Sequence, residues 1–287
     1  MLTLNAPAKI NWFLKVFTLR SDGYHEIESL IQKISLYDVL VFAPSRELTL
    51  TTNMQIPAEQ NLAYKSAVLL KNECRINAGA EISLNKNIPV SAGLGGGSSD
   101  AASTLIGLNK VWSLGLSRNE LCAFAERLGS DVPFFLHGPL ALVKGRGEKI
   151  SDCKSVKPFN ILLVKPPVTV STRWAYENLK SARINGELTK ITPKADNIKF
   201  FTHAISKAEL PGDRYIENDI ESVTVKSFPV IADIKHRLLR EGAIFSMMSG
   251  SGPTVFGVFG SAKEAENASK AFEECWTAVV QTITDNI

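Results

Sequence analysis

One stretch in the middle of the chain, PVSAGLGGGSSDAAS (Pro89–Ser103), constrains the fold more than any other. It places four glycines within five residues and follows them with two serines and an aspartate. Residues 80–90 before it read as a strand, and apolar residues after it recur at helical spacing. We therefore expect a strand, a tight glycine turn and a helix in direct succession, with Ser98, Ser99 and Asp100 capping the helix. A flexible linker between domains does not fit this context.

Two common nucleotide-binding motifs do not describe the stretch. A P-loop needs a lysine after its last glycine, where Ser98 stands, and a Rossmann fingerprint needs a third glycine at the same position. A phosphate cradle remains, because glycines let backbone N–H groups face a ligand and a helix N-terminus adds partial positive charge. From the residues alone, a tight turn that binds nothing is the alternative.

The bulk composition is typical of a globular protein with a substantial core. The chain has 287 residues, of which 45% are hydrophobic and 21% charged, and this length predicts about two domains. The net charge of +3 is spread along the sequence, which suits an anionic small molecule. We expect no nucleic-acid partner, since no basic stripe with interleaved aromatic residues is present.

The cysteines and the apolar segments indicate the compartment. Four cysteines stand far apart without a C-x-x-C pair, so we expect neither a zinc site nor a disulfide framework. The first residues lack the apolar core of a signal peptide, and no apolar run reaches the ~18 residues of a membrane helix. These features predict a cytoplasmic protein that does not bind membranes.

Strands and helices are mixed along the chain without strict alternation, which predicts an α+β fold. A polar stretch over 151–158 marks the expected boundary between a domain of residues 1–155 and a domain of residues 156–287. One strand is expected over 140–150, and a last helix is expected to run to Cys275.

Local patterns place two further elements. Residues 8–17 alternate like a strand, which puts Lys9, Asn11 and Phe13 on one face. Ser117 and Glu120 form a capping box at the start of a helix.

The glycine stretch resembles the ATP-binding motif of the GHMP kinases (galactokinase, homoserine, mevalonate and phosphomevalonate kinases). Four other segments resemble that family in the same order: APAKIN, DGYHEIESLIQKISLYD, LGSDVPFFLHG and MSGSGPTVFG. Ser91 is a small departure, since glycine or another small residue is more usual there. The resemblance implies a two-domain GHMP kinase fold, with an N-terminal half like ribosomal protein S5 domain 2 and a ferredoxin-like C-terminal half.

Within this family the chain is most similar to the kinases whose substrate is a methylerythritol linked to cytidine diphosphate, in the non-mevalonate route to isoprenoid precursors. The resemblance implies that ATP is the cofactor and that Mg²⁺ arrives with it, without a protein metal site of its own. Ser99 is the candidate for a protein ligand to that ion. The residues expected to hold ATP are Pro89, Val90, Ser91, Ala92, Gly93, Leu94, Gly95, Gly96, Gly97, Ser98 and Ser99.

Lys9 and Asp131 are the candidate catalytic residues. Phosphoryl transfer needs an aligned hydroxyl and cations around the moving charge more than covalent help from the protein. Taken singly, Asp131 could serve a turn and Lys9 could be a solvated strand lysine. The resemblance implies instead that Asp131 orients or deprotonates the acceptor hydroxyl and that Lys9 is its partner.

Four residues are candidates for binding the substrate: Asn11, Tyr24, His25 and Tyr176. An aromatic ring beside an imidazole suits a nucleobase, because one can stack and the other can read an edge. A surface tyrosine and a turn histidine are the alternatives for Tyr24 and His25, which the resemblance assigns to the cytosine ring. Tyr176 is expected on the opposite face of that ring, although nearby Trp174 could take the same place or either residue could belong to the core.

The remaining family segments carry less chemistry. Gly250 and Gly252 would let the C-terminal half approach the site closely, and Asn218–Asp219 match a family pair for which capping is the only physical role the sequence suggests.

Two rival functions stay open: a GHMP kinase for another alcohol, and a non-catalytic sensor that keeps the nucleotide site. A weak homodimer is possible.

Overall fold

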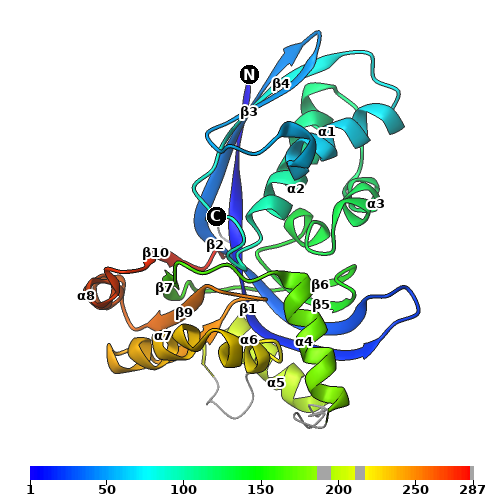
Figure 1. Cartoon of the computed structure of the whole chain (residues 1–287). Helices are drawn as coiled ribbons and strands as arrows, with labels where there is room; N and C mark the ends of the chain where they lie inside the picture. Colours follow the sequence, from blue (N-terminus) through cyan, green and yellow to red (C-terminus); the bar gives the residue numbers. More distant parts are fainter. Residues whose placement is uncertain (186–194, 211–216, 285–287) are drawn as a thin grey trace.

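A computed structural model describes residues 1–185, 195–210 and 217–284, with the side chains of 195–198 left out (Figure 1). The described chain forms two sheets with helices packed against them, so the predicted α+β class is confirmed. The strands of one sheet lie within residues 2–153 and those of the other within 160–281. The division of the chain into domains at residue 155 stays a prediction.

The six-stranded sheet has the order β3-β4-β2-β5-β6, with β1 paired to β2. Its strands are β1 (Leu2–Leu19), β2 (His25–Ser45), β3 (Leu48–Thr52), β4 (Gly79–Asn85), β5 (Leu140–Gly145) and β6 (Lys149–Cys153). Helices α1 (Leu62–Glu73), α2 (Gly96–Val111) and α3 (Arg118–Leu128) lie together on one side of its upper part (Figure 1). Short 3₁₀ turns over Ala58–Gln60 and Pro133–Leu136 complete this half.

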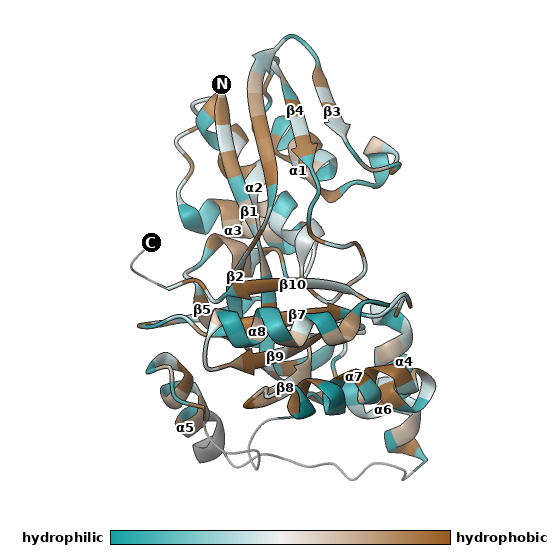
Figure 2. Ribbon diagram, turned by 90° about the vertical axis from the view of Figure 1, so that its left-hand side faces the viewer, coloured by the Kyte–Doolittle hydropathy of each residue, from teal (hydrophilic) through white to brown (hydrophobic). Residues whose placement is uncertain are grey.

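The four-stranded antiparallel sheet has the order β10-β7-β9-β8. Its strands are β7 (Asn160–Lys165), β8 (Phe245–Met248), β9 (Val255–Phe259) and β10 (Trp276–Gln281). Its half of the chain also contains α4 (Thr172–Ile184), α5 (Ala195–Ser206), α6 (Glu221–Ser227), α7 (Pro229–Arg240), α8 (Ala262–Ser269) and a 3₁₀ turn over Lys270–Phe272. Figure 2 shows α8 across this sheet. Helix α5 lies beneath the β1–β2 hairpin (Figure 1), and its buried Phe201 and Ile205 share a hydrophobic core with residues of the sheet.

The long β1–β2 hairpin connects the two halves and carries the first functional segment. The predicted strand over 8–17 lies within β1, and a direct hydrogen bond between Lys9 and Asn11 confirms that these two share a face. The prediction for Phe13 was wrong. Pairing with β2 shifts by one residue between Asn11 and Phe13, and the Phe13 ring is buried against Phe201 of α5. A bulge of this kind turns a side chain away from simple alternation.

Other local predictions met mixed outcomes. The capping box of α3 is present, with the Ser117 side chain accepting a hydrogen bond from the Glu120 N–H. The strand expected over 140–150 is instead the β5–β6 hairpin, because Gly145 and Gly147 take left-handed backbone angles and reverse the chain. The last helix ends at Ser269 rather than Cys275, and β10 begins at Trp276.

Helix α2 starts earlier than predicted. Its N-cap is Gly95, which has a left-handed φ of +71°, and its first turn contains Gly96 and Gly97. Ser98, Ser99 and Asp100 therefore lie inside the helix, and the prediction that they cap it was wrong. The glycines free the first backbone N–H groups of the helix from side-chain obstruction, and such groups have no partner within a helix.

The packing of α2 on the sheet gives a stability prediction. A Cβ atom on Gly107 would lie 2.5 Å from Cε2 of the buried Phe42 ring, so Gly107→Ala should lower the free energy of unfolding by about 1–3 kcal/mol. In Gly97→Ala, the added Cβ would meet only Leu62 Cδ1 at 3.6 Å, and no comparable loss is expected. Urea denaturation of both variants measures the difference, and equal stabilities would contradict this account of the packing.

Candidate active site

A cleft of about 670 Å³ opens where the glycine stretch, the start of α4 and the turn before β9 meet. Among the predicted site residues, it is lined by Lys9, Asn11, Asp131, Tyr176, Pro89, Val90, Ser91, Ala92, Gly93, Gly95, Gly96, Gly97 and Ser98. Leu94, Ser99, Tyr24 and His25 are not part of its lining. Segments that lie far apart in the sequence therefore meet around one hollow.

Lys9 and Asp131 face each other in this cleft. The Lys9 Nζ lies 3.7 Å from Asp131 Oδ2, and the lysine side chain is 5% exposed whereas the aspartate side chain is 43% exposed. The same Nζ donates a hydrogen bond of 2.6 Å to Asn11 Oδ1. Burial lowers the pKa of Lys9, and the charge of Asp131 opposes that shift. The pair thus joins a fixed, nearly dry ammonium group to a carboxylate that solvent and substrate can reach.

Second contacts fix the orientation of this pair. Asn11 Nδ2 donates to Ser29 Oγ at 2.8 Å, and that hydroxyl donates to the Phe13 carbonyl. Glycines permit the close packing around the lysine: a Cβ on Gly95 would lie 2.9 Å from Lys9 Cγ, and one on Gly250 would lie 3.1 Å from Lys9 Nζ. Any larger residue at either glycine would displace the ammonium group.

The glycine stretch forms an irregular turn with repeated left-handed residues. Ser91, Gly93 and Gly95 have φ values of +52°, +76° and +71°. The conformation of Ser91 explains why glycine is expected there, because left-handed angles strain residues with a Cβ. Leu94 turns into the apolar core, while its carbonyl accepts a hydrogen bond of 2.9 Å from the Lys9 N–H. The turn is therefore fixed directly to the strand that carries Lys9.

Two buried side chains after the turn had been assigned to capping. Ser99 is fully buried and its Oγ has no hydrogen-bond partner, so its geometry gives no support to the prediction that it binds Mg²⁺. Asp100 pairs at 2.7 Å with Lys86 Nζ, which also pairs with Asp38. Burial raises the pKa of Asp100 to about 7, although the charge of Lys86 opposes this shift. Asp38 in turn accepts backbone hydrogen bonds from Asn87 and Ile88.

The aromatic candidates differ in their position relative to the cleft. Tyr176 lines it, and the His25 ring stacks on Tyr176 with centroids 5.8 Å apart and planes at 29°. Burial raises the pKa of Tyr176, with Asp131 and Asp219 adding to the shift. Tyr24 is 49% exposed, and Cζ of the Arg146 guanidinium group lies over its ring, 5.3 Å from the ring centroid. Trp174 packs against Phe228 in the core of the C-terminal half and does not line the cleft.

Asn218 and Asp219 connect the two halves of the chain. The Asn218 side chain donates to the carbonyls of Met248 and Gly250, at 2.9 Å and 2.7 Å. Asp219 accepts hydrogen bonds from the Val16 N–H, Lys15 and Arg183, and its own N–H donates to the Leu14 carbonyl. This pair positions the Gly250–Gly252 turn and α4 against β1, a role that capping preferences do not reveal.

Lys86, Ser29 and residues 169–172 are functional candidates that sequence reasoning missed. Lys86 lines the cleft, and its Nζ lies 3.2 Å from the place of a Cβ on Gly96. Its partner Asp38 stands 48 residues earlier in the chain, so no local pattern could reveal the pair. Residues 169–172 have no motif, and they reach the cleft only because α4 begins there.

The Lys9–Asp131 pair yields a test of its electrostatics. Since the charge of Asp131 raises the pKa of Lys9 against the effect of burial, Asp131→Asn should lower that pKa further. Titration of the Lys9 ¹³Cε resonance by NMR measures the change. Asp22→Asn, in the exposed turn of the β1–β2 hairpin, is the charge-matched control and should leave the midpoint in place. An unchanged or raised midpoint in Asp131→Asn would exclude the proposed coupling.

Comparisons with known proteins agree with this architecture. Residues 61–139 match the family profile of the GHMP kinase N-terminal domain, and residues 208–278 match that of the GHMP kinase C-terminal domain. The chain is 42% identical over 290 residues to a 4-diphosphocytidyl-2-C-methyl-D-erythritol kinase of Thermodesulfovibrio yellowstonii, covering 99% of both chains. It is 40% identical to a kinase of that name from Pelotomaculum thermopropionicum, covering 100% of this chain and 99% of the other.

Solved structures lead to the same assignment. A crystal structure of 4-(cytidine 5'-diphospho)-2C-methyl-D-erythritol kinase matches with a TM-score of 0.81 and 30% identity, covering 98% of this chain and 99% of the other. A homoserine kinase from Cytophaga hutchinsonii matches with a TM-score of 0.74 and 20% identity, covering 99% of this chain and 94% of the other, which shows a shared fold alone. The chain belongs to the GHMP kinase family and, within it, to the 4-diphosphocytidyl-2-C-methyl-D-erythritol kinases.

Proposed function

We propose that this chain transfers the γ-phosphoryl group of ATP to the 2-hydroxyl of 4-diphosphocytidyl-2-C-methyl-D-erythritol, in the non-mevalonate synthesis of isoprenoid precursors. The observation that carries the proposal is the Lys9–Asp131 pair, which faces the glycine stretch across one cleft. Full-length similarity to kinases of that name supports the choice of substrate.

The glycine stretch fits the phosphates of ATP. The N-terminus of α2 points its first backbone N–H groups toward the cleft, where Gly96, Gly97 and Ser98 lie in its lining. Because these donors have no partner within the helix, a phosphate satisfies them and gains from the helix dipole. Lys86 lies beneath Gly96, so the cradle contains a lysine although the glycine motif itself has none, and its ammonium group is paired with Asp38 and Asp100.

Mg²⁺ would enter with ATP and, when bound, would neutralise charge on the phosphates. Among the described residues no cluster of three or more metal-ligating side chains is present. The exposed carboxylate of Asp131 lies in the cleft, whereas the Ser99 hydroxyl is buried away from it. The residues thus fit an ion that is held mainly by the nucleotide and water, as Mg²⁺ sites commonly are.

Asp131 and Lys9 would have different roles in the transfer step. Asp131 would accept a hydrogen bond from the acceptor hydroxyl and receive its proton as the oxygen–phosphorus bond forms. Lys9 would hold the carboxylate and stabilise charge on the transferred group, since a buried ammonium group needs no solvent reorganisation. The Asn11–Ser29 chain would keep the ammonium group in place during the step.

Recognition of the cytidine diphosphate would depend on Tyr176 and His25. The His25 ring stacks on Tyr176, and the base would stack on the outer face of this pair while polar atoms of neighbouring groups read its edge. His25 Nδ1 lies 3.1 Å from the Phe17 carbonyl, which fixes the plane of the imidazole. Tyr24 would close over the base from its exposed position beside Arg146.

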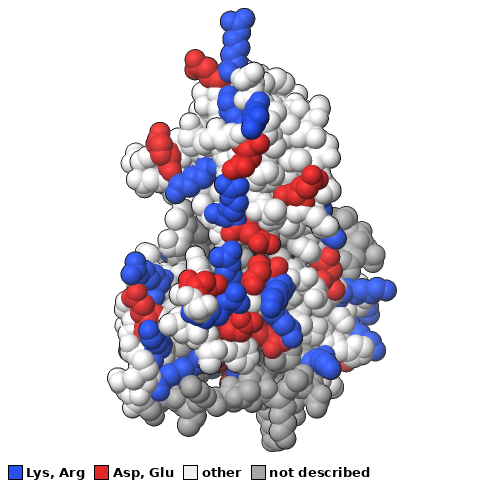
Figure 3. Space-filling view, turned by 90° about the vertical axis from the view of Figure 1, so that its right-hand side faces the viewer, with Lys and Arg blue, Asp and Glu red and all other residues white. Residues whose placement is uncertain are grey.

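Other partners are less constrained. On the face shown in Figure 3, Lys and Arg side chains are interspersed with Asp and Glu, so that face carries no basic stripe for nucleic acid. Among the described helices, none is long and apolar enough to cross a membrane. The weak homodimer stays a prediction.

The deciding experiment measures ADP release from ATP and Mg²⁺ with three separate acceptors: the cytidyl compound, mevalonate and homoserine. Turnover with the cytidyl compound alone would support the proposed substrate. Turnover with another alcohol would retain the phosphate cradle and the Lys9–Asp131 pair but reject the substrate. Nucleotide binding without turnover in any reaction would favour the sensor.

Asp131→Asn should fold normally and lower kcat by roughly 10²- to 10⁴-fold, because the amide cannot receive the proton of the acceptor hydroxyl. The Asp131 side chain is 43% exposed, and its replacement removes one contact of the buried Lys9, at 3.7 Å. Lys9 keeps its hydrogen bond to Asn11. Steady-state kinetics with ADP detection measures the loss, and calorimetric binding of ATP should be retained. Near-full turnover would remove Asp131 from the reaction.

Tyr176→Ala should raise KM for the cytidyl substrate by about 5- to 100-fold, because it removes an aromatic surface on which a base can stack. Tyr176→Phe keeps the ring and is the matched control, for which a KM near the native value is expected. KM for ATP should change little in either variant. If Tyr176→Ala leaves both KM values unchanged, the stacking assignment is wrong.

A further inference from the structure

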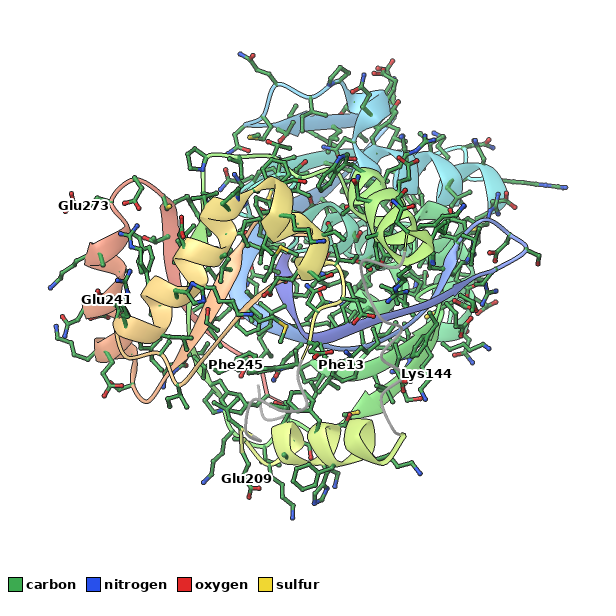
Figure 4. The ribbon with its side chains drawn as sticks, turned by 60° about the horizontal axis from the view of Figure 1, so that its bottom comes forward. Phe13, Lys144, Glu209, Glu241, Phe245 and Glu273 are labelled. Carbon is green, nitrogen blue, oxygen red and sulfur yellow. The ribbon has the colours of Figure 1, made fainter. Side chains whose placement is uncertain are left out.

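A second cavity, of about 650 Å³, lies between the β5–β6 hairpin and α5. Its lining shares no residue with the cleft that holds Lys9 and Asp131. One wall is formed by Leu142, Lys144 and Cys153 of the hairpin, and the other by the face of α5 that includes Thr202. Figure 4 shows Lys144 on the side of the molecule next to α5, and Glu209 just beyond the end of that helix.

The rim of this cavity is strongly basic. Lys144 is neutralised, because its Nζ pairs with Glu28 at 2.7 Å. Lys154, Lys199 and Lys207 also line the cavity, and none of them forms an ion pair with any described residue. Among the described residues, these three lysines therefore have no counter-ion, and the described lining contains one carboxylate, Glu28, which is paired with Lys144.

The floor of the cavity is apolar. Val156 is 48% exposed, and it lines the cavity together with Leu142 and Cys153. The hydrocarbon stems of the lysines add to this apolar surface. Among the described lining residues His203 alone has a ring, so they offer a nucleobase little to stack on. A short hydrocarbon group suits this floor better than a polar or aromatic one.

We propose that this cavity binds a phosphate monoester that carries a short hydrocarbon group, at a site separate from the kinase cleft. The unpaired lysines hold the phosphate as point charges. The hydrocarbon group covers Leu142, Cys153 and Val156. The proposal does not depend on which alcohol the kinase phosphorylates.

Hexyl phosphate is the probe, and the thiol of Cys153 reports on the cavity. All four cysteines are free and partly buried, so Cys74, Cys122 and Cys275 are internal controls on the same molecule. Carboxamidomethylation by iodoacetamide, followed by peptide mass spectrometry, gives the rate at each thiol. The rate at Cys153 should fall along a saturation curve, by about tenfold at about nine times Kd, since only free protein reacts. The other three rates should not change.

Calorimetric titration with hexyl phosphate gives the same Kd independently of thiol reactivity. The double variant Lys199→Gln/Lys207→Gln should weaken binding by about tenfold or more, because two phosphate contacts are lost. Lys65→Gln, at an exposed lysine of α1 outside both cavities, is the matched control and should bind like the native chain. ADP release by each variant shows that the kinase cleft remains intact.

Five outcomes would overturn the proposal. Equal slowing at all four thiols, or no heat of binding, would show that the cavity takes no such ester. Equal affinity for inorganic phosphate would remove the hydrocarbon subsite, and equal affinity for hexanol would remove the phosphate subsite. Protection by vesicles that contain phosphatidic acid, without protection by soluble hexyl phosphate, would assign the basic rim to a membrane surface instead.

Discussion

The buried ammonium group of Lys9 is the constraint on which the rest of this structure depends. A charge that is 4% exposed is tolerated only where acceptors surround it, and here Asn11 and Asp131 supply them. The space around the group exists because Gly95 and Gly250 have no Cβ. These glycines belong to motifs from opposite halves of the chain, so both motifs follow from the need to enclose one lysine.

The same constraint explains how tightly the halves are joined. A Cβ on Gly93 would lie 2.2 Å from the Ser249 carbonyl oxygen, and the Ser249 hydroxyl donates to the Gly93 carbonyl at 3.0 Å. Asn218 holds the other side of this turn through two carbonyls. Any movement that separated the halves would break the hydrogen bond between Ser249 and Gly93, and leaving buried polar groups unpaired is costly. The phosphate cradle and the acceptor site are thus kept in one register by hydrogen bonds from side chains to backbone carbonyls.

What the sequence predicted correctly was local. The period of a strand placed Lys9 beside Asn11, and the spacing of Ser117 and Glu120 predicted the start of α3. One error came from a tertiary effect, because a pairing shift turned Phe13 toward α5. Another came from local turn chemistry, because Gly145 and Gly147 split one expected strand into β5 and β6. The resemblance to a family supplied Asp131 and Tyr176, for which the residues alone left a turn and a core position open.

The Asp38–Lys86–Asp100 cluster shows most clearly what local reading omits. Two carboxylates and one ammonium group would leave a net negative charge under Gly96, where the phosphates of ATP are proposed to lie. Burial raises the pKa of Asp100 to about 7, although the charge of Lys86 opposes this shift. Protonation of Asp100 would bring the net charge of the cluster to zero and reduce the repulsion between the helix start and an anion. The place of Asp100 after two serines had suggested only a helix cap, whereas its contact with Lys86 links it to a residue that lines the cleft.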